Sequence, residues 1–165
     1  MSDGDYIHGY MLNSGFAVEL TTWSHNNPTQ PLHFFWDKKK ASQTEMKTPM
    51  LTLHKLSDTL FLQYMAGCKA YATTGGFESV CEAMYMQKAV LMVPTHIEQE
   101  CNVIDAARTG AGVAANEFDL DILLNFISVY TKSMEFNYWT RTAESQFLFE
   151  LTRINFQESN VFATM

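Results

Sequence analysis

Two consecutive glycines, Gly75 and Gly76, lie where a predicted strand passes directly into a predicted helix. Glycine lets the backbone turn tightly and approach a ligand closely, because it has no Cβ. The start of a helix offers unpaired N–H groups and about half a positive charge. Together these features predict an anion site suited to a diphosphate, although packing alone can also place a double glycine after a strand. The candidate phosphate-binding residues are Thr74, Gly75, Gly76, Phe77, Glu78 and Ser79.

Better-known motifs do not fit the double glycine. No Gly-Lys-Ser/Thr follows, as a Walker loop requires, and the G-x-G-x-x-G of dinucleotide enzymes is absent from the sequence. Ser79 has Phe77 and Cys81 where the G-x-S-x-G of a hydrolase nucleophile has glycines. His96, Glu98 and Glu100 do not match H-E-x-x-H, so we expect no zinc chemistry.

A second polar segment, residues 94–102, follows the next predicted strand. The carboxyl ends of parallel strands meet at one edge of a sheet, so both segments should face one crevice. Glu98 and Gln99 could bind the vicinal hydroxyls of a sugar, because a carboxylate accepts hydrogen bonds and an amide both donates and accepts them. The alternative is that Glu98 and Glu100 only stabilise the positive end of their helix.

Strand and helix patterns alternate along the chain, which predicts an α/β fold: a Rossmann-like parallel sheet with helices on both faces. The expected strands are Tyr6–Leu12, Leu32–Trp36, Met50–Leu53, Ala70–Thr73, Ala89–Val93 and a short one near Val113. The expected helices are Phe16–Trp23, Asp58–Gly67, Phe77–Gln87, Ile97–Arg108, one capped by Asp119, and a last one carrying Phe147, Leu151 and Ile154. Ser24–Pro31 and Lys38–Pro49 read as loops.

Length and composition limit the classes of function. A chain of 165 residues that is 47% apolar predicts one folded domain, residues 1–165. The net charge of −7 disfavours nucleic acid as a partner. Apolar runs are far shorter than the roughly 20 residues that cross a bilayer. Three dispersed cysteines without a C-x-x-C pair, and no secretory signal pattern, indicate a cytoplasmic protein.

One run of charge stands out, Lys38–Lys40. It reads as a solvated loop, and the alternative is peripheral contact with an anionic membrane surface or with a ligand phosphate.

The two polar segments together resemble the donor-binding, C-terminal half of GT-B glycosyltransferases. Plant UDP-glycosyltransferases carry His-Cys-Gly-Trp-Asn-Ser-x-x-Glu followed by Asp-Gln-x-x-Asn. Here Thr74 to Glu82 precedes Glu98-Gln99-x-x-Asn102 at the same separation. The sequence is also similar to the peptidoglycan N-acetylglucosaminyltransferases and to bacterial glycosyltransferase-like proteins, and the whole chain fits their C-terminal domain.

The resemblance implies a role for each matching residue. Gly75, Gly76 and the helix start would hold the donor pyrophosphate, with Ser79 adding its hydroxyl. Glu82 would bind the ribose diol. Glu98 and Gln99 would hold the transferred sugar, and Asn102 would fix their loop or the phosphate. Where the plant enzymes place a Trp and a Gln for the uracil base, this chain has Leu56 and Thr59. The candidate base-contacting loop is Leu53, His54, Lys55 and Leu56.

The resemblance also implies the reaction. Retaining GT-B enzymes often carry a Glu eight residues before the position of Glu82, and Thr74 occupies that place, which favours inversion. The expected function is donor binding in a metal-independent glycosyltransferase, without a cofactor, that transfers a hexose or N-acetylhexosamine from a UDP-type sugar. The catalytic base and the acceptor pocket would belong to an N-terminal domain or a partner subunit. The alternatives are a noncatalytic interaction module of the same fold and a sugar-nucleotide epimerase-like domain.

Overall fold

The computed structural model describes residues 4–162, and side chains as far as Arg153. The chain divides into two compact units, one up to Lys132 and the other from Ser133. The first unit holds the sheet and five helices among the described residues, and the second holds one long helix, α6 (Glu135–Phe162). The predicted α/β class is confirmed for the first unit.

Within the described residues, seven strands form one sheet in the order β3-β4-β2-β1-β5-β6-β7. All neighbours pair in parallel except β3 and β4, which are antiparallel. The central strands are almost wholly buried, as expected of a parallel sheet covered on both faces. The bounds are β1 Ile7–Met11, β2 Leu32–Trp36, β3 Thr44–Met46, β4 Leu51–Lys55, β5 Ala70–Thr73, β6 Ala89–Met92 and β7 Gly112–Ala114.

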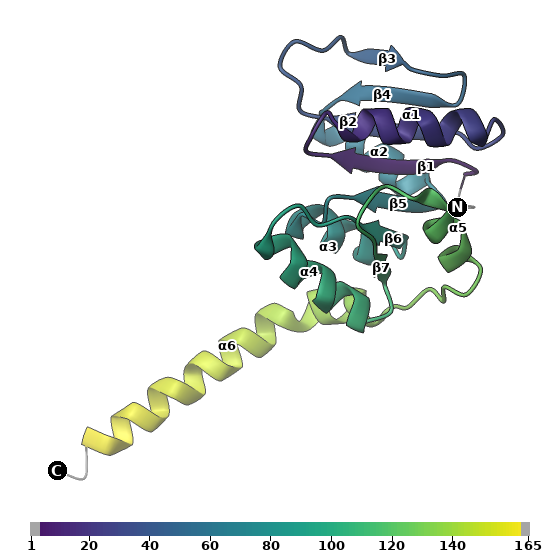
Figure 1. Ribbon diagram of the computed structural model, residues 1–165. Helices are drawn as coiled ribbons and strands as arrows, with labels where there is room; N and C mark the ends of the chain where they lie inside the picture. The colour runs from purple at the N-terminus through teal and green to yellow at the C-terminus, as the bar shows by residue number, and fades with distance from the viewer. Residues whose placement is uncertain (1–3, 163–165) are drawn as a thin grey trace. The chain divides into compact units, whose positions relative to one another are not determined.

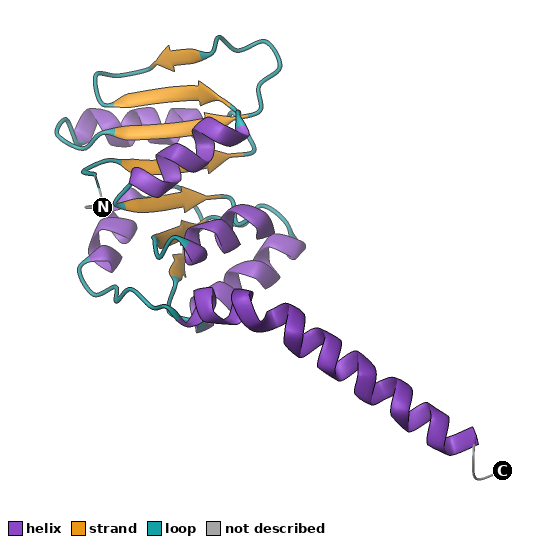
Figure 2. Cartoon of the chain, turned by 180° about the vertical axis from the view of Figure 1, so that it is seen from behind, coloured by secondary structure: helices purple, strands orange, loops and turns teal. Residues whose placement is uncertain are grey.

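Helices cover both faces of this sheet. Helices α1 (Phe16–Asn26) and α5 (Leu120–Ile127) pack on one face around Leu20 and Leu123. On the other face lie α2 (Asp58–Gly67), α3 (Phe77–Tyr85) and α4 (Ile97–Arg108). Figure 1 views the sheet from the side of α1, and Figure 2 views it from the side of α2. Side chains alternate along a strand, so successive residues of β1 point to opposite helix layers.

The strand order reverses beside β1. From β1 the chain moves by way of β2 to β4, and it then returns to β5 on the other side of β1 before moving on to β6 and β7. The connections that leave the carboxyl ends of β1 and β5 therefore diverge. In open α/β sheets such a point of reversal leaves a crevice that ligands occupy. The double glycine follows β5 and so lies at this point.

The structure corrects three parts of the predicted arrangement. Helix α1 continues to Asn26, three residues beyond the expected end, and there the Oγ of Ser24 lies 2.6 Å from the Oγ1 of Thr48 in a buried hydrogen bond. The expected loop Lys38–Pro49 contains β3, which forms by pairing with β4. The expected strand Met50–Leu53 starts at Leu51 as β4 and continues through His54 and Lys55, which were expected in a loop.

The last helix is longer than its apolar pattern indicated. Helix α6 runs from Glu135 as one element, with Phe147 and Leu151 exposed. The side chain of Ile154 lies outside the described residues. Among the described residues, no helix combines the length and apolar character needed to span a bilayer.

Candidate functional site

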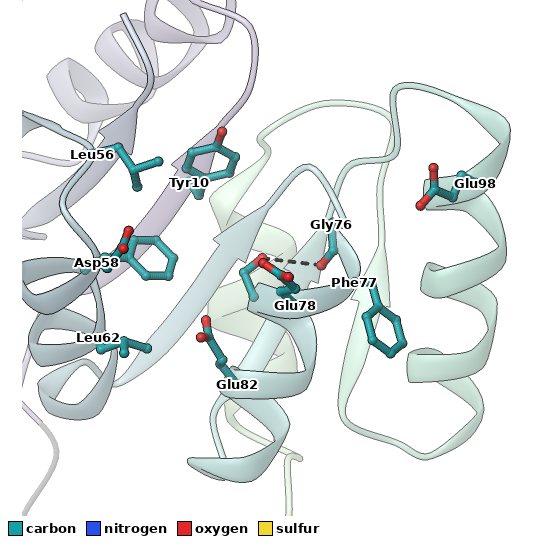
Figure 3. Close-up of a pocket in the computed structure, with 11 residues that line it drawn as sticks. Tyr10, Leu56, Asp58, Leu62, Gly76, Phe77, Glu78, Glu82 and Glu98 are labelled. Carbon is teal, nitrogen blue, oxygen red and sulfur yellow. Dashed lines mark hydrogen bonds between the residues drawn. The ribbon is translucent and has the colours of Figure 1, made fainter.

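A cavity of about 770 Å³ opens at the carboxyl edge of the sheet, where the strand order reverses. Its walls come from the end of β1, the start of α2, the start of α3 and the start of α4 (Figure 3). It is a hollow of the size that small-molecule ligands occupy. The described residues that line it are Tyr10, Leu56, Asp58, Phe61, Leu62, Gly76, Phe77, Glu78, Ser79, Glu82 and Glu98.

The start of α3 presents free amides to this cavity. Gly75 has φ +81°, a left-handed conformation that favours glycine, and Gly76 then caps a helix that begins at Phe77. The first bond of the helix runs from the N–H of Val80 to the carbonyl of Gly76, 3.2 Å away. In the described part of the chain, no hydrogen bond occupies the N–H groups of residues 77–79. Three donors and the positive end of a helix therefore face one side of the cavity.

The predicted phosphate-binding residues divide into two groups. Gly76, Phe77, Glu78 and Ser79 line the cavity, whereas Thr74 and Gly75 are buried and do not line it. Ser79 also donates its hydroxyl to the carbonyl of Gly76, over 3.4 Å. Asn102 donates from Nδ2 to the carbonyl of Gly75, over 3.4 Å, and so ties α4 to the glycine turn. Asn102 thus positions the loop that precedes the amides.

Glu98 and Gln99, predicted to bind the same sugar, lie in different environments. Glu98 is exposed at the first turn of α4 and lines the cavity. Gln99 is buried, and its Oε1 accepts hydrogen bonds from the N–H and the hydroxyl of Thr95, both over 2.8 Å. These two hydrogen bonds link the loop between β6 and α4 to the first turn of α4. Of the two residues, therefore, only Glu98 is placed to contact a ligand in the cavity.

The cavity is acidic. Asp58, Glu78, Glu82 and Glu98 line it, and none of the described lining residues is a Lys, Arg or His. Burial raises the pKa of the Glu82 carboxyl, and the nearby charges of Glu78 and Asp58 raise it further. These carboxylates therefore repel one another, and the positive charge at the site comes from helix starts, among them the free amides of α3.

The predicted base-contacting segment lies largely inside the sheet. Leu53 is fully buried in β4, and the ring of His54 stacks on Phe35 at 4.9 Å between centroids. Its Nε2 lies within hydrogen-bonding distance of Nδ1 of His33, at 3.1 Å. Only Leu56, which follows β4, lines the cavity. The interpretation as a loop is wrong for Leu53–Lys55, which belong to β4: all three pair with β2, and Leu53 and His54 also pair with β3.

Sequence reasoning missed the lining residues Tyr10, Asp58, Phe61 and Leu62. Tyr10 stands near the end of β1, on the face that carries α2, and the rule that ligands sit beyond strand ends could have drawn attention to it. The other three share one side of the first turns of α2. Identifying them required knowing that α2 packs beside α3 at this edge.

Comparison with known sequences assigns the chain to a family. The sequence model described as "Glycosyl transferase family 1" matches residues 32–130, which is more than half of the chain. The chain belongs to glycosyl transferase family 1. The match includes the double-glycine turn, Glu82 and the Glu98–Asn102 segment. No curated protein sequence matches the chain.

Solved structures of glycosyltransferases share this family 1 fold. The glycotransferase of kitacinnamycin superposes with a TM-score of 0.62 at 14% identity, over 76% of this chain and 35% of that one. The spinosyn rhamnosyltransferase SpnG complexed with thymidine diphosphate gives 0.58 at 10% identity, over 82% and 40%. UGT71G1 of Medicago truncatula complexed with UDP-glucose gives 0.52 at 11% identity, over 78% and 32%. The predicted GT-B resemblance is confirmed, and the family 1 chain spans well under half the length of these three structures.

The acidic and thiol side chains of this family 1 chain form no metal site in the described residues. Among its described residues, no group of three or more His, Cys, Asp or Glu side chains is arranged to hold a metal ion. The free cysteines Cys68, Cys81 and Cys101 range from buried to exposed.

Proposed function

We propose that this chain is the nucleotide-sugar-binding part of a glycosyltransferase that works without a metal ion and inverts the transferred sugar. The donor is a UDP-type sugar carrying a hexose or an N-acetylhexosamine. The observation that carries this proposal is the start of α3, where the N–H groups of residues 77–79 open on the cavity. A helix N-terminus of this kind favours a phosphate group.

The donor fits the cavity with its diphosphate at the amides of residues 77–79 and at the Ser79 hydroxyl. Glu82, one helical turn beyond Glu78, accepts hydrogen bonds from the ribose hydroxyls. The transferred sugar lies towards Glu98 on α4. The base lies at the opposite end, against Leu56 and the ring of Tyr10.

The amides also suit the chemistry of transfer. When an acceptor hydroxyl attacks the anomeric carbon, negative charge develops on the departing diphosphate. Donors fixed in place before the reaction stabilise such charge more strongly in the transition state than in the ground state. The general base that takes the acceptor proton belongs to the remaining part of the enzyme, a further domain or a partner subunit. The 165-residue chain alone should therefore bind the donor and transfer no sugar.

Ligand-induced stabilisation tests the proposal. A ligand present at 100 times its dissociation constant stabilises the folded state by about 2.7 kcal/mol, so millimolar UDP should raise the melting temperature by several degrees. Glu82→Gln should weaken UDP binding, because the neutral amide loses a charge-assisted hydrogen bond to the ribose. Glu100→Gln is the control, since Glu100 is exposed on α4 and does not line the cavity. No shift with UDP, TDP or GDP would refute donor binding.

A further inference from the structure

Two hydroxyl groups are buried beneath α3, on the strand that leads to the double glycine. Tyr71 and Thr73 are fully buried and lie two residues apart on β5, so their side chains point to the same face of the sheet. Among the described residues, neither Tyr71 Oη nor Thr73 Oγ1 forms a hydrogen bond. A buried hydroxyl without a partner is destabilising and uncommon in folded proteins. A role in ligand binding would account for both oxygens.

The phenol of Tyr71 lies behind the wall of the cavity. Its ring packs edge-on against Phe61, which lines the cavity, with 6.1 Å between the ring centroids. Burial raises the pKa of Tyr71, while its interactions with the Ser79 and Thr73 hydroxyls act in the opposite direction. The Tyr71 hydroxyl is therefore close to Ser79, one of the lining residues at the start of α3, although their contact does not have the geometry of a hydrogen bond.

Ser79 holds its own hydroxyl proton only weakly. It donates to the carbonyl of Gly76 over 3.4 Å, beyond the usual range of about 2.5–3.0 Å for a hydroxyl donor. A serine hydroxyl has one proton and two lone pairs, so it donates to one group at a time while its oxygen can still accept. If the proton turns from Gly76 to a diphosphate oxygen, the lone pairs of Ser79 remain available to Tyr71.

We propose, on the basis of the function proposed above, that Tyr71 is a positioning residue for donor binding: its hydroxyl donates to Ser79 Oγ while Ser79 donates to the diphosphate. Thr73 can in turn donate to Tyr71 Oη, so that both buried hydroxyls gain a partner. Consecutive hydrogen bonds polarise and strengthen one another, and this chain directs the Ser79 proton towards the ligand. The buried phenol thus increases the affinity for the donor without touching it.

Calorimetric titration with UDP and thermal denaturation of the full chain test the inference. Tyr71→Phe keeps the ring and removes the hydroxyl. UDP should bind about 2-fold to 10-fold more weakly, the loss expected for one hydrogen bond. Without ligand the variant should melt at the same temperature or higher, because it loses a buried hydroxyl that has no partner. A merely structural role of the hydroxyl predicts the opposite, a lower melting temperature with unchanged binding.

Tyr6→Phe is the matched control. The Tyr6 hydroxyl donates to the carbonyl of Tyr64 over 2.8 Å, and Tyr6 does not line the cavity. Its removal should lower the melting temperature by a few degrees and leave the affinity for UDP unchanged.

Ser79→Ala completes a double-mutant cycle with Tyr71→Phe. In the Ser79→Ala background the acceptor of the Tyr71 hydroxyl is gone. Tyr71→Phe should then change the affinity for UDP by less than about 1.5-fold, because residues that act through one another are not additive.

The outcomes separate the two proposals. If UDP does not bind the unmodified chain, the proposed function fails. If UDP binds and Tyr71→Phe binds it as tightly, the role of Tyr71 is refuted while donor binding stands. If Tyr71→Phe weakens UDP binding equally with and without Ser79, the phenol does not act through Ser79 and the inference is overturned. A loss of affinity accompanied by a lower melting temperature would likewise overturn it, since the hydroxyl would then support the fold.

Discussion

Substituting the two glycines before α3 separates ligand contact from folding. Gly76 has φ −61° and ψ 137°, a conformation that alanine adopts without strain. A Cβ at this position would meet only the Ser79 Oγ within 4 Å, at 3.9 Å. Gly76→Ala should therefore change the free energy of unfolding by less than about 1 kcal/mol. The new methyl group would instead stand in the space through which a phosphate approaches the amides.

The loss of affinity can be estimated from hydrogen bonding. If the methyl group prevents one charge-assisted hydrogen bond to the diphosphate, binding loses about 1.5–3 kcal/mol, or roughly 10-fold to 100-fold in affinity. Gly75→Ala is the contrasting variant. At φ +81° alanine costs about 1–2 kcal/mol, and its Cβ would lie 3.0 Å from Cγ2 of Val103. This variant should melt about 2–8 °C lower.

Calorimetric titration with UDP and thermal denaturation without ligand measure the two effects. Gly76→Ala should melt close to the unmodified chain and bind UDP poorly, whereas Gly75→Ala should melt at a lower temperature. A folded Gly76→Ala variant that binds UDP with unchanged affinity would show that the α3 amides do not contact the phosphates. Equal melting of Gly75→Ala and the unmodified chain would contradict the strain argument.

Three further predictions concern His8, Lys88 and the cavity residue Tyr10. Burial lowers the pKa of His8 to about 3, so from pH 6.5 down to about 3 the unfolded chain binds a proton that the folded chain does not. The free energy of unfolding should decrease as the pH drops below 6.5. In urea denaturation at pH 5, His8→Leu should remove about 2 kcal/mol of this decrease. An unchanged pH profile in the variant would exclude His8 as the cause. Lys88 is buried, and its Nζ donates hydrogen bonds to the carbonyls of Ala66, over 2.9 Å, and Cys68, over 2.7 Å. Lys88→Met should therefore lower the free energy of unfolding by about 2–3 kcal/mol. A decrease below about 1 kcal/mol would count against this role. Tyr10→Ala should weaken UDP by about 5-fold to 100-fold through loss of base stacking while Tyr10→Phe retains binding; equal effects on UDP and on ribose 5-diphosphate would exclude a base contact.

Elements that carry their own local signal were predictable from the sequence. Short, mostly apolar runs such as Ala70–Thr73 form buried parallel strands, and Asp119 caps α5 by accepting a hydrogen bond from the N–H of Asp121 at 3.0 Å. The double-glycine junction also carries its signal locally, because a positive φ and a helix start follow from adjacent residues. Its location at the cavity then follows from the parallel order of the strands.

Features that depend on tertiary contacts could not be predicted in this way. Strand β3 has only three residues, too few for a period, and exists by pairing with β4. Glu98 and Gln99 are adjacent in sequence and both are polar. Only the structure reveals that the side-chain oxygen of Gln99 accepts hydrogen bonds from Thr95. Tyr10 resembles any other aromatic strand residue until β1 is known to lie beside β5 at the point of reversal.

The two outermost strands of the sheet have a consequence for behaviour at high concentration. The edge strands β3 and β7 each contain three residues, so each edge of the sheet exposes few unpaired backbone groups to another molecule. At β3 the ion pair of Glu45 with Lys47, at 2.8 Å, adds charge beside that edge. Short edge strands, and at β3 the added charge, hinder the strand-to-strand addition from which fibrils grow. The sheet should therefore resist fibril formation even when the protein is concentrated for crystallisation or calorimetry.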